Sequence, residues 1–284
     1  MDGVVFRRAR PWLGTLVEMR VEGLDAMRAI RAIEAAFAEV AAVHRCMSFH
    51  EPGSDLSRLH RAPAETAVRV DARTRAVLEC ALLVAKQSNG CFDPTIAARK
   101  VEQGMLPRPD SPFEPDSRAT WRDIELLDDN QVRLLRPLWI DLGGIAKGYA
   151  VDCAIEVLHD AGVTQACVNA GGDLRVAGSR AERVHVRDAL GDVVEAVDLA
   201  NGAIASSTSA PRGVAAQHWH GGEYRAVSGA NTVTVAAPHC MIADALTKVV
   251  LAQPAASSAV LAGFGAHACT HDPRRGWRHV GVAA

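Results

Sequence analysis

Hydrophobic residues recur at helical spacing in four segments of the chain. In residues 25–45, apolar side chains return every three or four positions, and Asp25 stands where a helix N-cap is expected. Asp71 precedes the second segment and Asn89-Gly90 follows it, and Gly162 follows the third, as is typical of helix starts and ends. We therefore predict four helices, over residues 25–45, 73–87, 150–161 and 241–253.

Shorter runs of apolar and β-branched residues between these helices predict strands. One run, 124–135, surrounds Asp128-Asp129-Asn130 and indicates a hairpin. The strands occur as hairpins as often as they alternate with helices, which favours an α+β fold of layered antiparallel or mixed sheets with packed helices. The remaining predicted strands are 12–21, 166–170, 174–177, 184–186, 193–199, 203–206, 232–236 and 277–282.

Residues 100–119 carry four prolines and show no periodicity. Such a segment is typical of a long surface loop or of a connector. We expect residues 1–284 to form a single domain with two lobes, joined near 100–119.

The segment 141–152 is the best candidate for chemistry. It follows a short apolar run and leads into a predicted helix, with Asp141, two glycines and Lys147 at the turn. Free backbone N–H groups at a helix start suit a phosphate, and Lys147 would neutralise its charge. The spacing matches neither common nucleotide-binding glycine motif. Two interpretations stay open: a nucleotide site, or an ordinary turn with a solvated lysine.

Composition narrows the class of protein. The chain has 284 residues, 49% of them hydrophobic, and a formal net charge of −2. Neutralising nucleic-acid phosphates would require a basic face, so nucleic acid is not the expected partner. No run approaches the roughly twenty apolar residues that span a bilayer. We expect no membrane insertion, a cytoplasmic location, and seven reduced cysteines.

Seven short motifs occur in one order along most of the chain. Each is weak alone, but together they resemble the ApbE family of FAD:protein FMN transferases. The motifs are Leu13-Gly14-Thr15, Met47-Ser48-Phe49 with 53–59, Gly90 to Thr95, Asp141 to Asp152, Val168 to Leu174, Ala203 to Ser207, and Ala243 to Leu246.

The resemblance implies a two-lobed architecture related to the T-fold, and a reaction. Members of the family transfer FMN from FAD to a threonine or serine of an acceptor flavoprotein, with release of AMP. The substrate would be FAD, and Mg²⁺ would bridge its diphosphate. A homodimer is a further possibility.

The resemblance also assigns roles to individual residues. FAD-binding residues would be Leu13, Phe49, Cys91, Phe92, Asp93, Asp141, Lys147, Ser206 and Ser207. Backbone carbonyls of Gly144 or Ala146, the Asp244 carboxylate and Thr247 would hold the metal, since Mg²⁺ prefers oxygen ligands. The catalytic residues would be Asp244, Lys147 and His218.

Two departures from the family pattern bear on these roles. The family usually has a threonine four residues after the metal aspartate, where this chain has Lys248; Thr247 comes one residue early. Either Thr247 still reaches the metal, or the Lys248 ammonium pairs with Asp244 and supplies part of the metal's charge.

The second departure is the missing Asp-Pro near His218. Either His218 is a general base with a pKa near working pH, or it belongs to an exposed loop. Arg212 is a candidate for a retained basic residue.

Two other functions therefore stand beside the transferase. The first is an FAD-binding homologue that does not catalyse transfer, which Lys248 and the missing Asp-Pro favour. The second is an FAD pyrophosphohydrolase, which would use water and give FMN and AMP.

Overall fold

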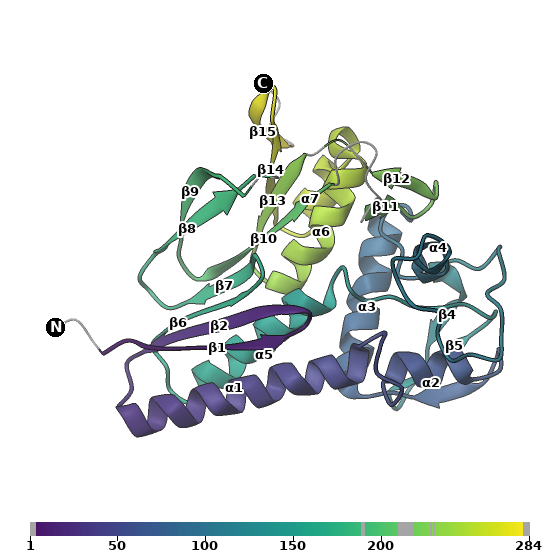
Figure 1. The fold of residues 1–284 in the computed structure, drawn as a ribbon, viewed down its shortest axis with the longest axis horizontal. Helices are drawn as coiled ribbons and strands as arrows, with labels where there is room; N and C mark the ends of the chain where they lie inside the picture. Colours follow the sequence, from purple (N-terminus) through teal and green to yellow (C-terminus); the bar gives the residue numbers. More distant parts are fainter. Residues whose placement is uncertain (1–3, 189–190, 210–217, 228, 230, 281–284) are drawn as a thin grey trace.

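The computed structural model describes residues 4–188, 191–209, 218–227, 229 and 231–280. Its main element is an eight-stranded sheet in which all neighbouring strands run antiparallel (Figure 1). In order across the sheet, the strands are β1 (Phe6–Trp12), β2 (Thr15–Glu22), β6 (Gln165–Ala170), β7 (Asp173–Ala177), β10 (Gly202–Thr208), β13 (Thr232–Ala237), β14 (His267–Asp272) and β15 (Gly276–Val280).

Helices cover one face of this sheet. They are α1 (Ala26–Met47), α5 (Ala146–Asp160) and α6 (Cys240–Ala252), which share the main hydrophobic core with the strands (Figure 1). Strand β2 illustrates why the sheet is covered on this face: alternate residues of a strand point to the same face, and Val17, Met19 and Val21 are fully buried. On the other face, a hairpin of β8 (Glu182–Arg187) and β9 (Val193–Leu199) packs on β7 and β10. The layered α+β prediction is confirmed.

A smaller group of elements lies beside the main layers (Figure 1). It contains α2 (Asp55–Arg61), α3 (Ala72–Gln87), α4 (Ala97–Glu102) and the three-stranded sheet of β3 (Ala67–Arg69), β5 (Gln131–Leu134) and β4 (Ile124–Leu126). The proline-rich residues 103–119 connect α4 to the short 3₁₀ helix η1 (Trp121–Asp123), which precedes β4. The division into two lobes stays a prediction.

Local signals located the long helices correctly. The carboxylates of Asp25 and Asp71 accept hydrogen bonds from the backbone N–H groups of Arg28 (3.0 Å) and Arg73 (2.9 Å), as N-caps do. All seven cysteines are free. None of the helices in the described ranges combines the length and hydropathy needed to cross a bilayer.

The predicted strand over residues 12–21 is confirmed from Thr15 onward, as β2, but its start is wrong because the chain turns there. Leu13 (φ 57°) and Gly14 (φ 72°) form the turn between β1 and β2. Leucine rarely adopts positive φ, so the sequence carries only a partial turn signal there. Several short elements were not predicted: β3, α4, the hairpin of β11 (His218–His220) and β12 (Arg225–Val227), η2 (Pro254–Ala256), α7 (Ser258–Gly263) and β14. Arg212 and the end of the predicted strand 277–282 lie outside the described residues.

Helices α5 and α6 approach each other closely at Gly148. A Cβ atom on Gly148 would lie 2.3 Å from the carbonyl oxygen of Cys240 and 2.8 Å from the Cα atom of Met241. Both are backbone atoms, so a side-chain rotation cannot relieve the overlap. The absence of a side chain at Gly148 therefore sets the spacing of the two helices.

Replacing Gly148 with alanine tests this spacing. Helix propensity alone predicts that Gly148→Ala raises the free energy of unfolding by about 1 kcal/mol. Overpacking against α6 predicts the opposite, a loss of about 1–3 kcal/mol. We expect the loss, measured by chemical denaturation. Gly53→Ala is the control, since a Cβ there meets nothing within 4 Å. A Gly148→Ala protein more stable than the wild type would contradict this account.

Candidate functional site

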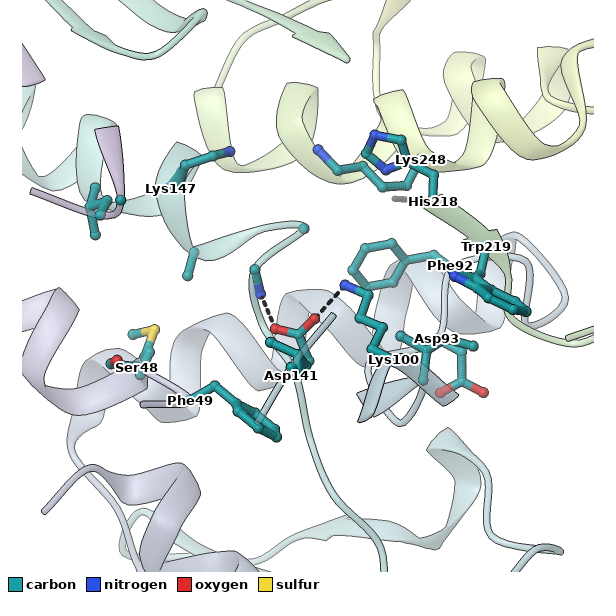
Figure 2. Close-up of a pocket in the computed structure, with 18 of the residues that line it drawn as sticks. Ser48, Phe49, Phe92, Asp93, Lys100, Asp141, Lys147, His218, Trp219 and Lys248 are labelled. Atoms are coloured by element: carbon teal, nitrogen blue, oxygen red, sulfur yellow. Dashed lines mark hydrogen bonds and ion pairs between the residues drawn. The ribbon is translucent and has the colours of Figure 1, made fainter. Parts of the chain in front are cut away.

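A cavity of about 460 Å³ lies where the start of α5, helix α6 and the β11 hairpin meet the segments around Phe49 and Phe92 (Figure 2). Ten of the predicted site residues line it. They are Leu13, Phe49, Cys91, Phe92, Asp93, Asp141, Gly144, Ala146, Lys147 and His218. The other four, Ser206, Ser207, Asp244 and Thr247, do not line it. The fold thus gathers residues from four of the seven motifs around one cavity.

The cavity lining combines apolar and cationic side chains. Phe49, Phe92 and Trp219 supply aromatic surface, while Lys147 and Lys248 bring charge. Figure 2 shows the two lysine side chains extending toward one another along the side formed by α5 and α6. Such a lining suits a ligand with a flat apolar part and a negatively charged part.

Asp244 is the anchor for both lysines. Its side chain is fully buried in α6, and Lys248, one turn later, pairs with its Oδ1 atom. Its Oδ2 atom accepts from the backbone N–H of Gly148 at 3.2 Å and lies 3.4 Å from Nζ of Lys147. Lys147 also pairs with Asp173, at the start of β7. Two carboxylates and two ammonium groups therefore form one neutral network.

The network shifts the pKa values of its members. Burial disfavours an ionised Asp244, but the charges of Lys147 and Lys248 outweigh burial and lower its pKa to about 2. Burial and the nearby Asp244 charge raise the pKa of Asp173 to about 6. Burial also opposes the charge of Lys147, yet Asp244 and Asp173 hold its pKa above the ordinary value. Near neutral pH Lys147 therefore remains charged.

The two predicted serines do not line the cavity and bond other side chains. Ser206 Oγ hydrogen-bonds Thr234 Oγ1 across the β10–β13 pair (2.9 Å). Ser207 Oγ lies 2.8 Å from Oγ1 of Thr247, whose hydroxyl also donates to the Asp244 carbonyl oxygen at 2.7 Å. Both hydroxyl oxygens also accept from the ammonium group of Lys248, which does line the cavity.

A second ion pair lines the cavity at Asp141. Lys100 Nζ lies 2.5 Å from one carboxylate oxygen of Asp141, and the Gly143 N–H donates to the other at 2.8 Å (Figure 2). Burial opposes ionisation of Asp141, but Lys100 outweighs it and lowers the pKa. Lys100 was not predicted, because no motif surrounds it. Asp173 was not assigned a role either, although it lies within a matched motif.

His60 positions the chain that leads to Asp141. Its Nε2 atom accepts the backbone N–H of Ile140 at 2.8 Å, and its ring lies 5.5 Å from that of Phe49. Burial lowers the pKa of His60 to about 4. The accepting nitrogen must be unprotonated, so the folded protein holds a neutral ring there. No sequence signal marked this residue.

His218 lies in the cavity lining, but its pKa differs from the expected one. Burial and the charges of Lys248 and Lys100 lower the pKa of His218 to about 3, instead of leaving it near working pH. The ring is therefore neutral in the free site, with one nitrogen lone pair available. It is a weak base until negative charge enters the cavity.

The side chains around Asp244 do not fit a Mg²⁺ ion. Mg²⁺ requires oxygen ligands at 2.0–2.1 Å in octahedral geometry. Each oxygen of Asp244 already faces an ammonium group. At an effective dielectric constant of about 20, a divalent ion about 4 Å from one ammonium is repelled by roughly 8 kcal/mol. Within the described part of the chain, no three His, Cys, Asp or Glu side chains group as a metal site.

Sequence comparison identifies the family. The profile of the ApbE family matches residues 13–268, so the chain belongs to this family, as its motifs indicated. It is 28% identical to an FAD:protein FMN transferase of Treponema pallidum over 183 residues, 60% of this chain and 51% of that protein. It is 31% identical to one of Rhodobacter capsulatus over 204 residues, 66% of this chain and 39% of that protein. The matches thus span about half or less of these relatives.

Solved structures show the same fold. The ApbE protein of Thermotoga maritima superposes with a TM-score of 0.84 at 23% identity, over 98% of this chain and 97% of that one. The apo flavinyl transferase ApbE of Pseudomonas stutzeri gives 0.83 at 18% identity, over the full length of both.

Because the fold holds His60 neutral, we expect the free energy of unfolding to depend on pH. Its pKa of about 4 in the folded protein lies below the ordinary value of 6.5, so the unfolded chain binds the proton more tightly. The contribution of His60 to stability is present above pH 6.5 and is lost as the pH falls toward 4. We expect His60→Gln, which keeps an acceptor but does not titrate, to reduce this slope by up to about 1.4 kcal/mol per pH unit.

The measurement is urea denaturation of both proteins between pH 7 and pH 4. Carboxylates titrate in the same range, so only the difference between the two slopes reports on His60. Parallel curves would show that His60 is not held neutral.

Proposed function

We propose that this protein is an FAD:protein FMN transferase that moves FMN from FAD to a threonine or serine hydroxyl of an acceptor protein and releases AMP. The observation that carries the proposal is the cavity itself, where two paired lysines lie beside aromatic side chains. The curated relatives carry this name, which supports it further.

The cavity lining suits the two chemically different parts of FAD. Phe49, Phe92 and Trp219 offer surface on which the flavin ring packs. The ammonium groups of Lys147 and Lys248, with the positive end of the α5 helix dipole, attract the diphosphate. Asp244 and Asp173 hold Lys147 in place before the substrate arrives, so little reorganisation is needed.

The transfer step is a displacement at phosphorus. The acceptor hydroxyl oxygen forms a bond to the FMN phosphorus, and the bond from this phosphorus to the bridging oxygen breaks. The bridging oxygen leaves with AMP, and the hydroxyl proton passes to the neutral ring of His218. Binding a diphosphate brings negative charge toward His218, which makes the ring a stronger base. No step is assigned to magnesium, because the groups around Asp244 do not fit the ion.

The proposal is tested by incubating the protein with FAD and a peptide that carries a threonine, followed by mass spectrometry and AMP analysis. We expect the peptide to gain the mass of FMN, with one AMP released for each. A peptide with valine in place of the threonine is the control and should stay unmodified. AMP without modified peptide would indicate hydrolysis by water, and FAD recovered intact would indicate a binding protein. Either result would contradict the transferase.

Replacing His218 separates binding from transfer. We expect His218→Gln to lower kcat by about 10²-fold, the low end for a general base, because the pKa of this ring is low. The affinity for FAD should stay nearly unchanged, since a neutral ring carries no charge to the diphosphate. His159→Gln, at an exposed position of α5, is the matched control. An unchanged kcat in His218→Gln would remove His218 from the mechanism.

A further inference from the structure

The ammonium group of Lys248 lies among oxygen atoms that the family resemblance gives to a metal. Its three N–H donors are matched by three oxygens: Oδ1 of Asp244, Oγ1 of Thr247 at 3.0 Å and Oγ of Ser207 at 3.1 Å. Asp244 and Thr247 are two of the residues assigned to Mg²⁺ by resemblance. A cation already occupies the centre of this set of oxygens, and it belongs to the chain.

The position of Lys248 follows from the helix that carries it. Residues four apart on a helix lie on one face, so a lysine after Asp244 at this spacing reaches its carboxylate (i, i+4). The Lys248 side chain is 15% exposed, while that of Asp244 is fully buried. The lysine therefore pairs with a buried carboxylate, while its own side chain lines the cavity.

Charge balance at this position favours an ammonium over a divalent ion. The two carboxylates of Asp244 and Asp173 match the charges of Lys147 and Lys248. Adding a divalent ion would leave an excess of positive charge in a buried site, with two ammonium groups as near neighbours.

We infer that Lys248 takes the place of a divalent cation beside Asp244, so that FAD is bound through the ammonium groups of Lys147 and Lys248 and not through a metal bridge. This inference rests on the proposed function, because it concerns how the same cavity holds the FAD diphosphate. It assigns to Lys248 the two tasks of the metal: compensation of the charge of Asp244, and electrostatic attraction of the diphosphate.

The experiment measures FAD affinity by quenching of flavin fluorescence, in EDTA and in MgCl₂. We expect the wild type to bind FAD with the same affinity in both buffers. Lys248→Thr should lose about tenfold or more in EDTA, where the positive charge at the cavity wall is missing, and should recover in MgCl₂. Lys248→Met should lose the same affinity and recover less, since it adds no hydroxyl ligand. Lys86→Met, which removes an exposed lysine from α3, should match the wild type.

A second measurement uses Mn²⁺ as a spectroscopic probe of the metal position. By electron paramagnetic resonance, we expect no saturable Mn²⁺ binding to the wild type and one bound Mn²⁺ in Lys248→Thr. Wild-type data alone decide the main point, so a poorly folding variant does not obscure it.

The outcomes separate this inference from the proposed function. FAD binding by the wild type that requires MgCl₂, or saturable Mn²⁺ binding beside Lys248, would overturn the inference and leave the transferase standing. Tight FAD binding in EDTA without transfer to a peptide would support the inference and contradict the transferase. No FAD binding in either buffer would overturn both.

Discussion

The buried carboxylate of Asp244 is the constraint on which the site depends. It has no exposure to solvent, and its oxygens are held by Lys147 and Gly148 of α5 and by Lys248 of α6. Removing one partner of a buried ion pair typically costs about 3–5 kcal/mol, because the other charge is left uncompensated. The same contacts that fix α5 against α6 also place two ammonium groups at the cavity, so the stability of this layer and the charge of the site cannot be changed separately.

A second ionic contact aligns the same two helices one turn further along α5. The residue before α6, His239, makes no side-chain cap. The Asp152 carboxylate accepts from the backbone N–H groups of Cys240 and Met241, each at 2.9 Å, and Arg175 of β7 pairs with it at 2.8 Å. The unpaired donors at the start of α6 are thus satisfied from α5. Residues 148 and 152 lie on one face of α5, which therefore contacts α6 at two successive turns.

Features that depend on local sequence could be predicted. The helices begin at Asp25 and Asp71 because a carboxylate caps the free N–H groups of the following turn, and that signal lies within four residues. The hairpin at 128–130 is equally local, with Asp129 and Asn130 at positive φ. The turn at Leu13 was missed because leucine is a poor residue for positive φ, and the pairing of β1 with β2 supplies the stabilisation.

The site could be predicted only in part, because much of it depends on contacts between residues that are far apart in the sequence. Motifs located most of the cavity lining, but they do not show which charges pair across it. The partners of Lys147 and Asp141 are Asp173, 26 residues along the chain, and Lys100, 41 residues before it. Residue spacing within one element does not determine such contacts. His60 is the extreme case, since its acceptor role exists only after the chain brings Ile140 to it from 80 residues away.

Lys248 shows that the effect of a substitution depends on the residues that contact the new side chain. Judged by the family pattern alone, a lysine at the position of the usual threonine would mean the loss of a metal ligand. In the structure, the side chain reaches a buried carboxylate one helical turn away and two hydroxyl oxygens, so its charge is compensated and its three donors are used. An unpaired ammonium would be costly in this position, whereas a paired one supplies positive charge at the cavity wall. The departure from the family pattern is thus compatible with a working anion site, provided that Asp244 remains its partner.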